Sequence, residues 1–120
     1  MTKLSEIPHI KLMKVVQLYI DGKPLFGVEN EHTSYHVLIL EECLRKEGIE
    51  FNLIPIDNGN DFGPALKGER YRAVGMGFLI KGGNKFYFSG SSQDYGIGID
   101  KTHLEDYKQS VENLEMIVSS

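Results

Sequence analysis

The feature that most constrains the fold is a glycine turn that follows an alternating apolar segment. Residues 10–20 alternate between two faces, and Asp21-Gly22 comes directly after them. Strict alternation is typical of a strand, and Asp-Gly suits a type I′ turn, in which both central residues adopt positive φ. The sequence therefore predicts a hairpin in which Ile20 lies opposite Lys23.

The second strand of this hairpin, residues 24–28, is expected at an edge of the sheet. Pro24 falls opposite Tyr19, at a position where the N–H that proline lacks would have pointed away from the first strand. The second face of the first strand carries Met13 and Val15, and it is too apolar to be simply solvated. We expect something to cover part of that face.

A second hairpin is predicted where residues 70–80 and 85–89 flank Gly82-Gly83. Taking the two glycines as the turn places Leu79 opposite Phe86. In the first of these strands Ala73, Gly75 and Gly77 alternate, so they are expected to form one small face against which a helix can pack closely.

Helical spacing occurs in two segments. Between residues 30 and 48 apolar side chains recur three and four positions apart, and Gly48 supplies the stop. The second helix is predicted over residues 102–118, because Thr102 and Glu105 have capping-box spacing ahead of an apolar stripe. We expect both helices to lie on one face of the sheet.

The remaining segments complete an α+β arrangement. A strand is expected at 49–57, a long polar loop at 58–69 and a second polar loop at 90–98, with residues 95–99 as a possible extra strand. The order is then ββαβββ(β)α, which predicts a mainly antiparallel five- or six-stranded sheet with two helices. This order is similar to that of profilin-like and longin-type domains, many of which are interaction modules.

Composition narrows the class of protein. A chain of 120 residues suits one domain, here 9–120, preceded by a flexible N-terminal arm over 1–8. With 13 basic and 17 acidic side chains and no basic cluster, neither nucleic acid nor a membrane surface is an expected partner. Cys43 is alone, which excludes an intrachain disulfide, and no segment resembles a signal peptide or a membrane span. We expect a cytoplasmic protein without a cofactor.

Two histidines near the start of the first helix suggest a metal site. His32 and His36 are four residues apart, so they can share one helix face and bind a metal together. Zinc would need a third protein ligand. The simpler interpretation is one exposed histidine and one histidine that packs beside Leu40.

The two polar loops suggest a ligand site. Loop 58–69 is unusually long for a compact domain, and the N–H groups and hydroxyls of residues 89–95, ahead of a helix, can hold an anion. The candidate ligand-binding residues are Asp61, Tyr71, Arg72, Ser91, Ser92, Asp94, Tyr95 and His103. No phosphate-binding loop or nucleophile elbow accompanies them, so a pair of polar connecting loops is the simpler interpretation.

Two hypotheses about function follow. The first is a non-catalytic binding domain that forms a homodimer or docks on a protein partner, using the free edge at 24–28 and the second face of the first strand. The alternative is a small-molecule or metal sensor, or an enzyme, that uses loops 58–69 and 90–98. A catalytic function is less favoured than a binding function. His36 and Cys43 are about 10 Å apart along a helix, so they cannot form a catalytic dyad.

Overall fold

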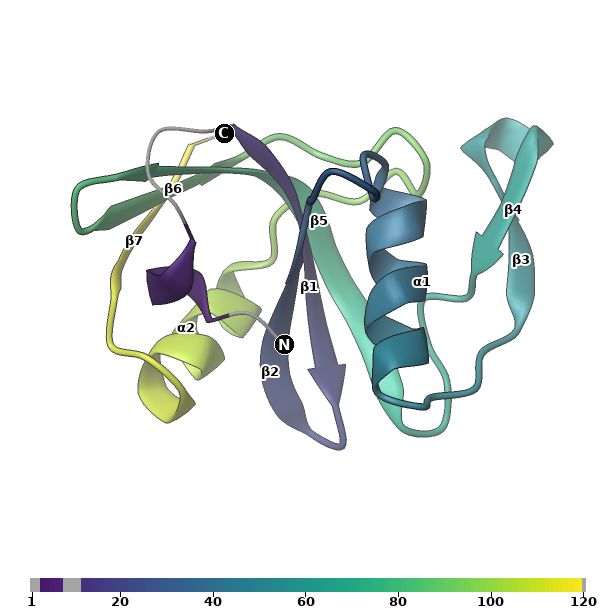
Figure 1. Cartoon of the computed structure of the whole chain (residues 1–120), viewed down its shortest axis with the longest axis horizontal. Helices are drawn as coiled ribbons and strands as arrows, with labels where there is room; N and C mark the ends of the chain where they lie inside the picture. The colour runs from purple at the N-terminus through teal and green to yellow at the C-terminus, as the bar shows by residue number, and fades with distance from the viewer. Residues whose placement is uncertain (1–2, 8–11, 120) are drawn as a thin grey trace.

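A five-stranded sheet with the order β2-β1-β5-β6-β7 organises residues 3–7 and 12–119, which the computed structural model describes (Figure 1). Its neighbours run antiparallel except β6 and β7, which pair in parallel. The chain is thus an α+β domain with a mainly antiparallel sheet, as predicted. The strands are β1 (Met13–Ile20), β2 (Lys23–Val28), β5 (Tyr71–Gly82), β6 (Lys85–Ser89) and β7 (Glu115–Val118).

Two α-helices, two 3-10 turns and a small ribbon complete the described chain. The helices are α1 (His36–Lys46) and α2 (Lys101–Ser110), and the 3-10 turns are η1 (Leu4–Glu6) and η2 (Asp57–Gly59). A separate two-stranded sheet is formed by β3 (Leu53–Ile56) and β4 (Asp61–Pro64). None of the helices in the described ranges is long and apolar enough to span a membrane.

The first hairpin has the predicted register. Ile20 pairs with Lys23, and both turn residues adopt positive φ, 51° at Asp21 and 81° at Gly22. The prediction that residues 24–28 form an edge strand is also confirmed, since β2 is the outermost strand of the sheet. Residues 10 and 11 of the predicted first strand lie outside the described residues.

The second hairpin forms, but the predicted register is wrong. Gly82 remains in β5 and pairs with Lys85, so the turn is Gly83-Asn84. Gly83 adopts a φ of 63°, as the first central residue of a type II′ turn does. Leu79 therefore lies opposite Phe88 rather than Phe86. A shift of two residues preserves the face of each side chain, so both phenylalanines remain in the core.

The two helices lie on opposite faces of the sheet, and the prediction that they share one face is wrong (Figure 1). Helix α1 packs on the face of β1 that carries Val16 and Leu18. Helix α2 and η1 pack on the other face, with Met13 and Val15. The second apolar face of β1 is therefore covered by the chain itself.

A β-bulge in β5 separates side chains that were expected to share a face. Gln17 pairs with Gly75 and Leu18 with Ala73, so Val74 is the extra residue. Ala73 consequently belongs to the core beneath α1, whereas Gly75 lies on the face of α2. The prediction of one small face along this strand is wrong for that reason.

The helix predicted over 102–118 begins close to the expected residue, at Lys101, but its predicted cap and its predicted C-terminal end are wrong. Its cap is Asp100, whose carboxylate accepts a hydrogen bond from the N–H of His103 at 2.8 Å. Helix α2 ends at Ser110, and β7 then pairs in parallel with β6, with Met116 beside Phe86. Leu114, Met116 and Val118 alternate in burial along this strand. The apolar stripe that suggested a helix also fits a period of two.

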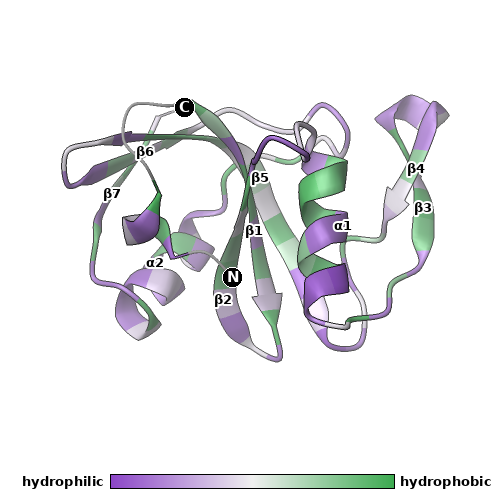
Figure 2. Cartoon of the chain, viewed as in Figure 1, coloured by the Kyte–Doolittle hydropathy of each residue, from purple (hydrophilic) through white to green (hydrophobic). Residues whose placement is uncertain are grey.

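The segment predicted as a loop over 58–69 contains β4, which pairs with β3 as a ribbon apart from the main sheet (Figure 1). The tip of this ribbon is hydrophilic, whereas β3 is largely hydrophobic (Figure 2). Leu53 and Phe62 are both 62% exposed. The possible strand at 95–99 is reduced to a single bridge between Ser91 and Gly98.

Candidate functional site

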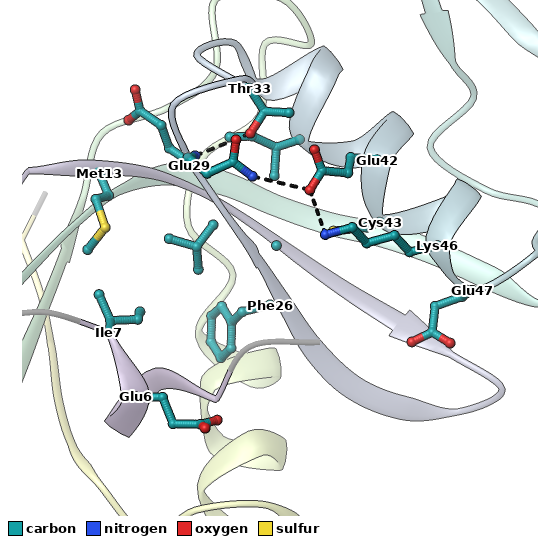
Figure 3. A pocket seen from close by; sticks show the side chains of 14 residues that line it. Glu6, Ile7, Met13, Phe26, Glu29, Thr33, Glu42, Cys43, Lys46 and Glu47 are labelled. Carbon is teal, nitrogen blue, oxygen red and sulfur yellow. Dashed lines mark hydrogen bonds and ion pairs between the residues drawn. The ribbon is translucent and has the colours of Figure 1, made fainter.

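A groove of about 630 Å³ runs along the outer edge of β2, between α1 and η1 (Figure 3). We call it the edge groove. It was not predicted as a cavity, although the edge strand that forms its floor was. Its geometry follows from the hairpin register, from the close packing of α1 and from the docking of η1.

Part of the β2 backbone points its hydrogen-bonding groups toward the edge groove rather than toward β1. Ile20 and Lys23 flank the turn and form a hydrogen-bonded pair, so hydrogen-bonded and non-hydrogen-bonded pairs alternate from there. The bond from the Glu29 N–H to the Lys14 carbonyl, 2.9 Å long, follows this alternation. Phe26 and Val28 consequently occupy non-hydrogen-bonded positions, and their N–H and C=O groups point away from β1. No strand in the described ranges pairs with this side of β2.

One wall of the edge groove belongs to α1, which lies very close to β2. A Cβ atom at Gly27 would lie 2.5 Å from Cys43 Sγ and 2.9 Å from Ile39 Cγ2, so only glycine fits beneath the helix. Burial raises the pKa of the Cys43 thiol to about 11, which leaves it a poor nucleophile. Glu42 and Lys46 form an ion pair of 2.9 Å on the same wall.

The opposite wall is apolar and is held in place by η1. Figure 3 shows Ile7 and Phe26 on the far side of β2 from the charged residues of α1. Lys81 Nζ donates hydrogen bonds to the carbonyls of Ser5 and Ile7, at 3.0 and 2.9 Å. Leu4 is fully buried beneath this turn. These contacts fix residues 3–7 of the predicted N-terminal arm against the sheet, whereas residues 1, 2 and 8 lie outside the described residues.

The edge groove is acidic. Among the described residues, four glutamates and one lysine line it, which leaves three negative charges in excess: Glu6, Glu29, Glu42, Glu47 and Lys46. Three of the carboxylates also have a structural partner. Glu6 accepts the N–H of Lys3 at 3.2 Å. Glu29 accepts the N–H of Lys14 at 2.9 Å, and Glu42 accepts a hydrogen bond from Asn30 Nδ2 at 3.2 Å.

The two candidate metal ligands lie in different environments. His32 is exposed and lies 3.4 Å from a carboxylate oxygen of Glu31. His36 is buried, and its Nε2 donates to the carbonyl of Gly77 at 2.9 Å. Burial lowers the pKa of His36. Within residues 3–7 and 12–119, no three His, Cys, Asp or Glu side chains gather in a way that could hold a metal ion.

The structure brings the two predicted ligand-binding loops into contact. The N–H of Asp57 donates to the carbonyl of Asp94 at 2.9 Å, and the Tyr95 hydroxyl donates to the carbonyl of Pro64 at 2.8 Å. The carboxylate of Asp94 accepts the N–H of Val37 at 3.5 Å, which supplies a cap to α1. Ser92 is buried, and its Oγ accepts the Tyr95 N–H at 3.2 Å. The polar groups of these loops thus bind one another.

The other candidate residues are divided among the exposed parts of these loops, the core beneath α1 and the opposite face of the sheet. Asp61 and Ser91 are exposed. Tyr71 belongs to the core beneath α1, where its hydroxyl donates to the carbonyl of Ala65 at 2.5 Å. Arg72 lies on the other face of the sheet, with its guanidinium 4.1 Å from the ring centroid of Tyr19.

His103 also lies on the face of α2, in a buried network that the sequence did not reveal. Its Nε2 donates to the carbonyls of Leu18 and Leu25, both at 3.0 Å, so Nδ1 accepts from Gln17 Nε2 at 3.2 Å. Gln17 is fully buried and forms two further hydrogen bonds with the backbone of Asp100. Burial lowers the pKa of His103. Every buried side-chain nitrogen and oxygen in the described part of the chain has a partner.

The residues of the edge groove were missed because its walls come from distant segments. Two residues in the sequence pointed toward this groove. Pro24 marked β2 as an edge strand, and Gly27 permits a helix to approach that strand closely. The acidic face of α1, with Glu42 and Glu47, was visible in the sequence, but its position beside β2 was not.

A scan against protein-family models finds no match for this chain, and a search of curated proteins finds no similar sequence.

Proposed function

We propose that this chain is a non-catalytic binding domain that docks on a protein partner through the edge groove. The observation that carries the proposal is the outward-pointing backbone of Phe26 and Val28, which lies within a groove of about 630 Å³. An extended segment that adds to such an edge gains main-chain hydrogen bonds, while flanking pockets select its side chains.

The size of the edge groove supports this mode of binding. Pockets that hold ligands typically measure about 300–1,000 Å³, and an added strand would lie about 4.8 Å from β2. Helix α1 lies on one side of the position that an added strand would take, and η1 lies on the other side. A strand in the groove would therefore make side-chain contacts in addition to its backbone hydrogen bonds.

A selection from a random linear peptide library tests this proposal. Peptides selected on the immobilised chain are expected to slow hydrogen exchange at the amides of Phe26 and Val28. The neighbouring amides of Leu25 and Gly27 already bond to β1, so they should change much less. Selection that yields no binding peptide, or binding peptides that leave both outward amides unprotected, would contradict the proposal.

A pair of matched variants sharpens the test. Val28→Pro removes an outward N–H without removing a hydrogen bond to β1, as Pro24 already does in this strand. Val28→Thr keeps the N–H and nearly the same volume. Binding should be lost with the proline and retained with the threonine.

A second candidate function is ligand binding at loops 58–69 and 90–98, which is favoured by the contact between them through Pro64 and Tyr95. Thermal shifts across a panel of metabolites and divalent metals test it. A ligand shift that is lost in Ser91→Ala or Asp61→Asn, both at exposed side chains, would support it. The absence of any shift would exclude the compounds tested as ligands.

A further inference from the structure

We infer that the edge groove takes an extended protein segment in which basic and apolar residues alternate, with the basic side chains facing α1. This inference rests on the proposed function and adds the chemistry of the partner. It follows from the different character of the two walls on either side of β2 (Figure 3).

The pleat of an added strand distributes its side chains between the two walls. Successive residues of a strand point to opposite faces of the sheet. In β2 itself, Gly27 faces α1, whereas Phe26 packs in the core on the side of α2 and η1. A segment that pairs with β2 therefore directs alternate side chains toward α1 and toward η1.

The wall formed by α1 favours basic side chains. It carries Glu42 and Glu47, and Glu29 lies at the end of β2 on the same groove. Lys46 neutralises one of these charges through its ion pair with Glu42. Lysine or arginine in the added segment would neutralise the remaining negative charge of this wall. An arginine could bind one carboxylate through two hydrogen bonds.

The wall on the side of η1 favours apolar side chains. Ile7, Met13 and Phe26 line it, and Val28 beside them is only half-buried. Glu6 is the charged residue on this side, and it lies at the rim (Figure 3). Valine, isoleucine or leucine at alternate positions would extend this apolar surface and would also favour an extended backbone.

The same charges disfavour a second copy of this chain as the occupant. The chain carries a net charge of −4, and pairing two β2 edges would bring two sets of groove glutamates together. Like charges placed across an interface oppose association. A basic segment from another protein fits the groove better.

The test compares three short synthetic peptides that differ in the residue that alternates with valine, which is basic, neutral or acidic: alternating Lys-Val, alternating Ser-Val and alternating Glu-Val. Each is titrated into the 120-residue chain at low salt, and affinity and amide exchange are both recorded by NMR. The Lys-Val peptide should bind at least tenfold more tightly than the Glu-Val peptide and should protect the amides of Phe26 and Val28.

Variants of the acidic wall identify the source of the preference. Glu42→Gln and Glu47→Gln should each weaken binding of the Lys-Val peptide about twofold to fivefold, as expected for partly exposed ion pairs. Glu105→Gln, at an exposed position on α2 outside the groove lining, is the matched control and should leave the affinity unchanged.

The outcomes separate this inference from the proposed function. Equal binding of the three peptides, with Phe26 and Val28 protected in each case, overturns the charge preference and leaves edge docking intact. Binding of the Lys-Val peptide without protection of these amides overturns both. A doubling of molecular mass with both amides protected in the absence of peptide assigns the groove to a second copy and overturns the inference.

Discussion

Gly75 pairs with Gln17 on the neighbouring strand, and the side chain of Gln17 lies over this glycine where it reaches the backbone of Asp100. Gln17 Nε2 donates to the Asp100 carbonyl at 2.9 Å, and its Oε1 accepts the Asp100 N–H at 2.8 Å. A Cβ atom on Gly75 would lie 2.1 Å from Gln17 Oε1. The glycine therefore leaves room for the bonds that hold the start of α2 against the sheet.

We expect Gly75→Ala to lower the free energy of unfolding by about 1–3 kcal/mol, because the added methyl must displace a buried amide network. Gly82→Ala in the same strand is the control, since its Cβ would lie 3.4 Å from the nearest atom of Tyr87. That control should be neutral or slightly stabilising. Urea denaturation measures both, and equal stabilities of the two variants would show that the network has no role.

The buried histidines make stability depend on pH. Burial lowers the pKa of both His36 and His103 below their ordinary value of 6.5. The folded chain thus binds fewer protons than the unfolded chain once the pH falls below 6.5. Protonation of His103 Nδ1 would also break its hydrogen bond with Gln17, because Gln17 Nε2 is a donor and a protonated Nδ1 can no longer accept.

We expect the free energy of unfolding to be highest above pH 6.5 and to fall as the pH is lowered toward 5.5. The slope should be at most about 1.4 kcal/mol per pH unit for each histidine. His36→Gln and His103→Gln should each flatten the profile in this range. Denaturation curves at several pH values measure this, and a profile that both variants leave unchanged would rule out these residues as its source.

At the scale of elements, α1 depends on a loop that is distant in sequence. Its N-cap residue, Tyr35, makes no side-chain hydrogen bond to the helix, and the carboxylate of Asp94 accepts the Val37 N–H instead. A carboxylate at this end also interacts favourably with the helix dipole. Asp94, which the sequence suggested as a ligand-binding residue, thus joins loop 90–98 to the helix.

We expect Asp94→Ala to destabilise the chain by about 0.5–1 kcal/mol, the lower range for loss of a cap, because the bond is long. Asp61→Ala is the matched control, since the Asp61 carboxylate is exposed and accepts only the neighbouring Phe62 N–H. Thermal and urea denaturation measure the difference. Equal stability of the two variants would leave Asp94 free for a role in binding.

The free edge of β2 carries features that limit uncontrolled pairing. Strand β2 is short, Pro24 interrupts its outward donors, and glutamates surround the groove beside it. Short edges, prolines and charged neighbours all oppose pairing between sheets of different molecules. These features would make the proposed docking at this edge selective.

At the scale of the whole molecule, one sheet separates two hydrophobic cores. The core beneath α1 contains Leu18 and Leu40, and the core beneath α2 contains Val15 and Leu104. Strands β1 and β5 contribute alternate residues to both cores. Neither core can therefore lose its central strands without exposing the other.

We expect the chain to unfold in a single cooperative transition. Leu40→Ala and Leu104→Ala should each lower the free energy of unfolding by about 2–5 kcal/mol, since each empties a buried site. In both variants, tyrosine fluorescence and circular dichroism should report the same midpoint. A separate early transition in only one variant would show that the two cores unfold independently.

What the sequence by itself determined is the structure that depends on near neighbours. Asp21-Gly22 fixed the register of the first hairpin, and Pro24 marked β2 as an edge, because turn geometry and a missing N–H act within a few residues. The edge that forms the floor of the candidate site was predictable for the same reason. The α+β class followed from these hairpins and from the spacing of apolar residues.

Where local rules allowed two answers, only the tertiary structure decided. Gly82-Gly83-Asn84 can turn at either pair without moving a side chain to the other face, and Leu114, Met116 and Val118 suit a strand as well as a helix end. The face on which each helix packs, and hence the two walls of the edge groove, depends on contacts such as Lys81 with Ile7 and Cys43 with Gly27. These contacts join residues far apart in the chain, so no local pattern encodes them.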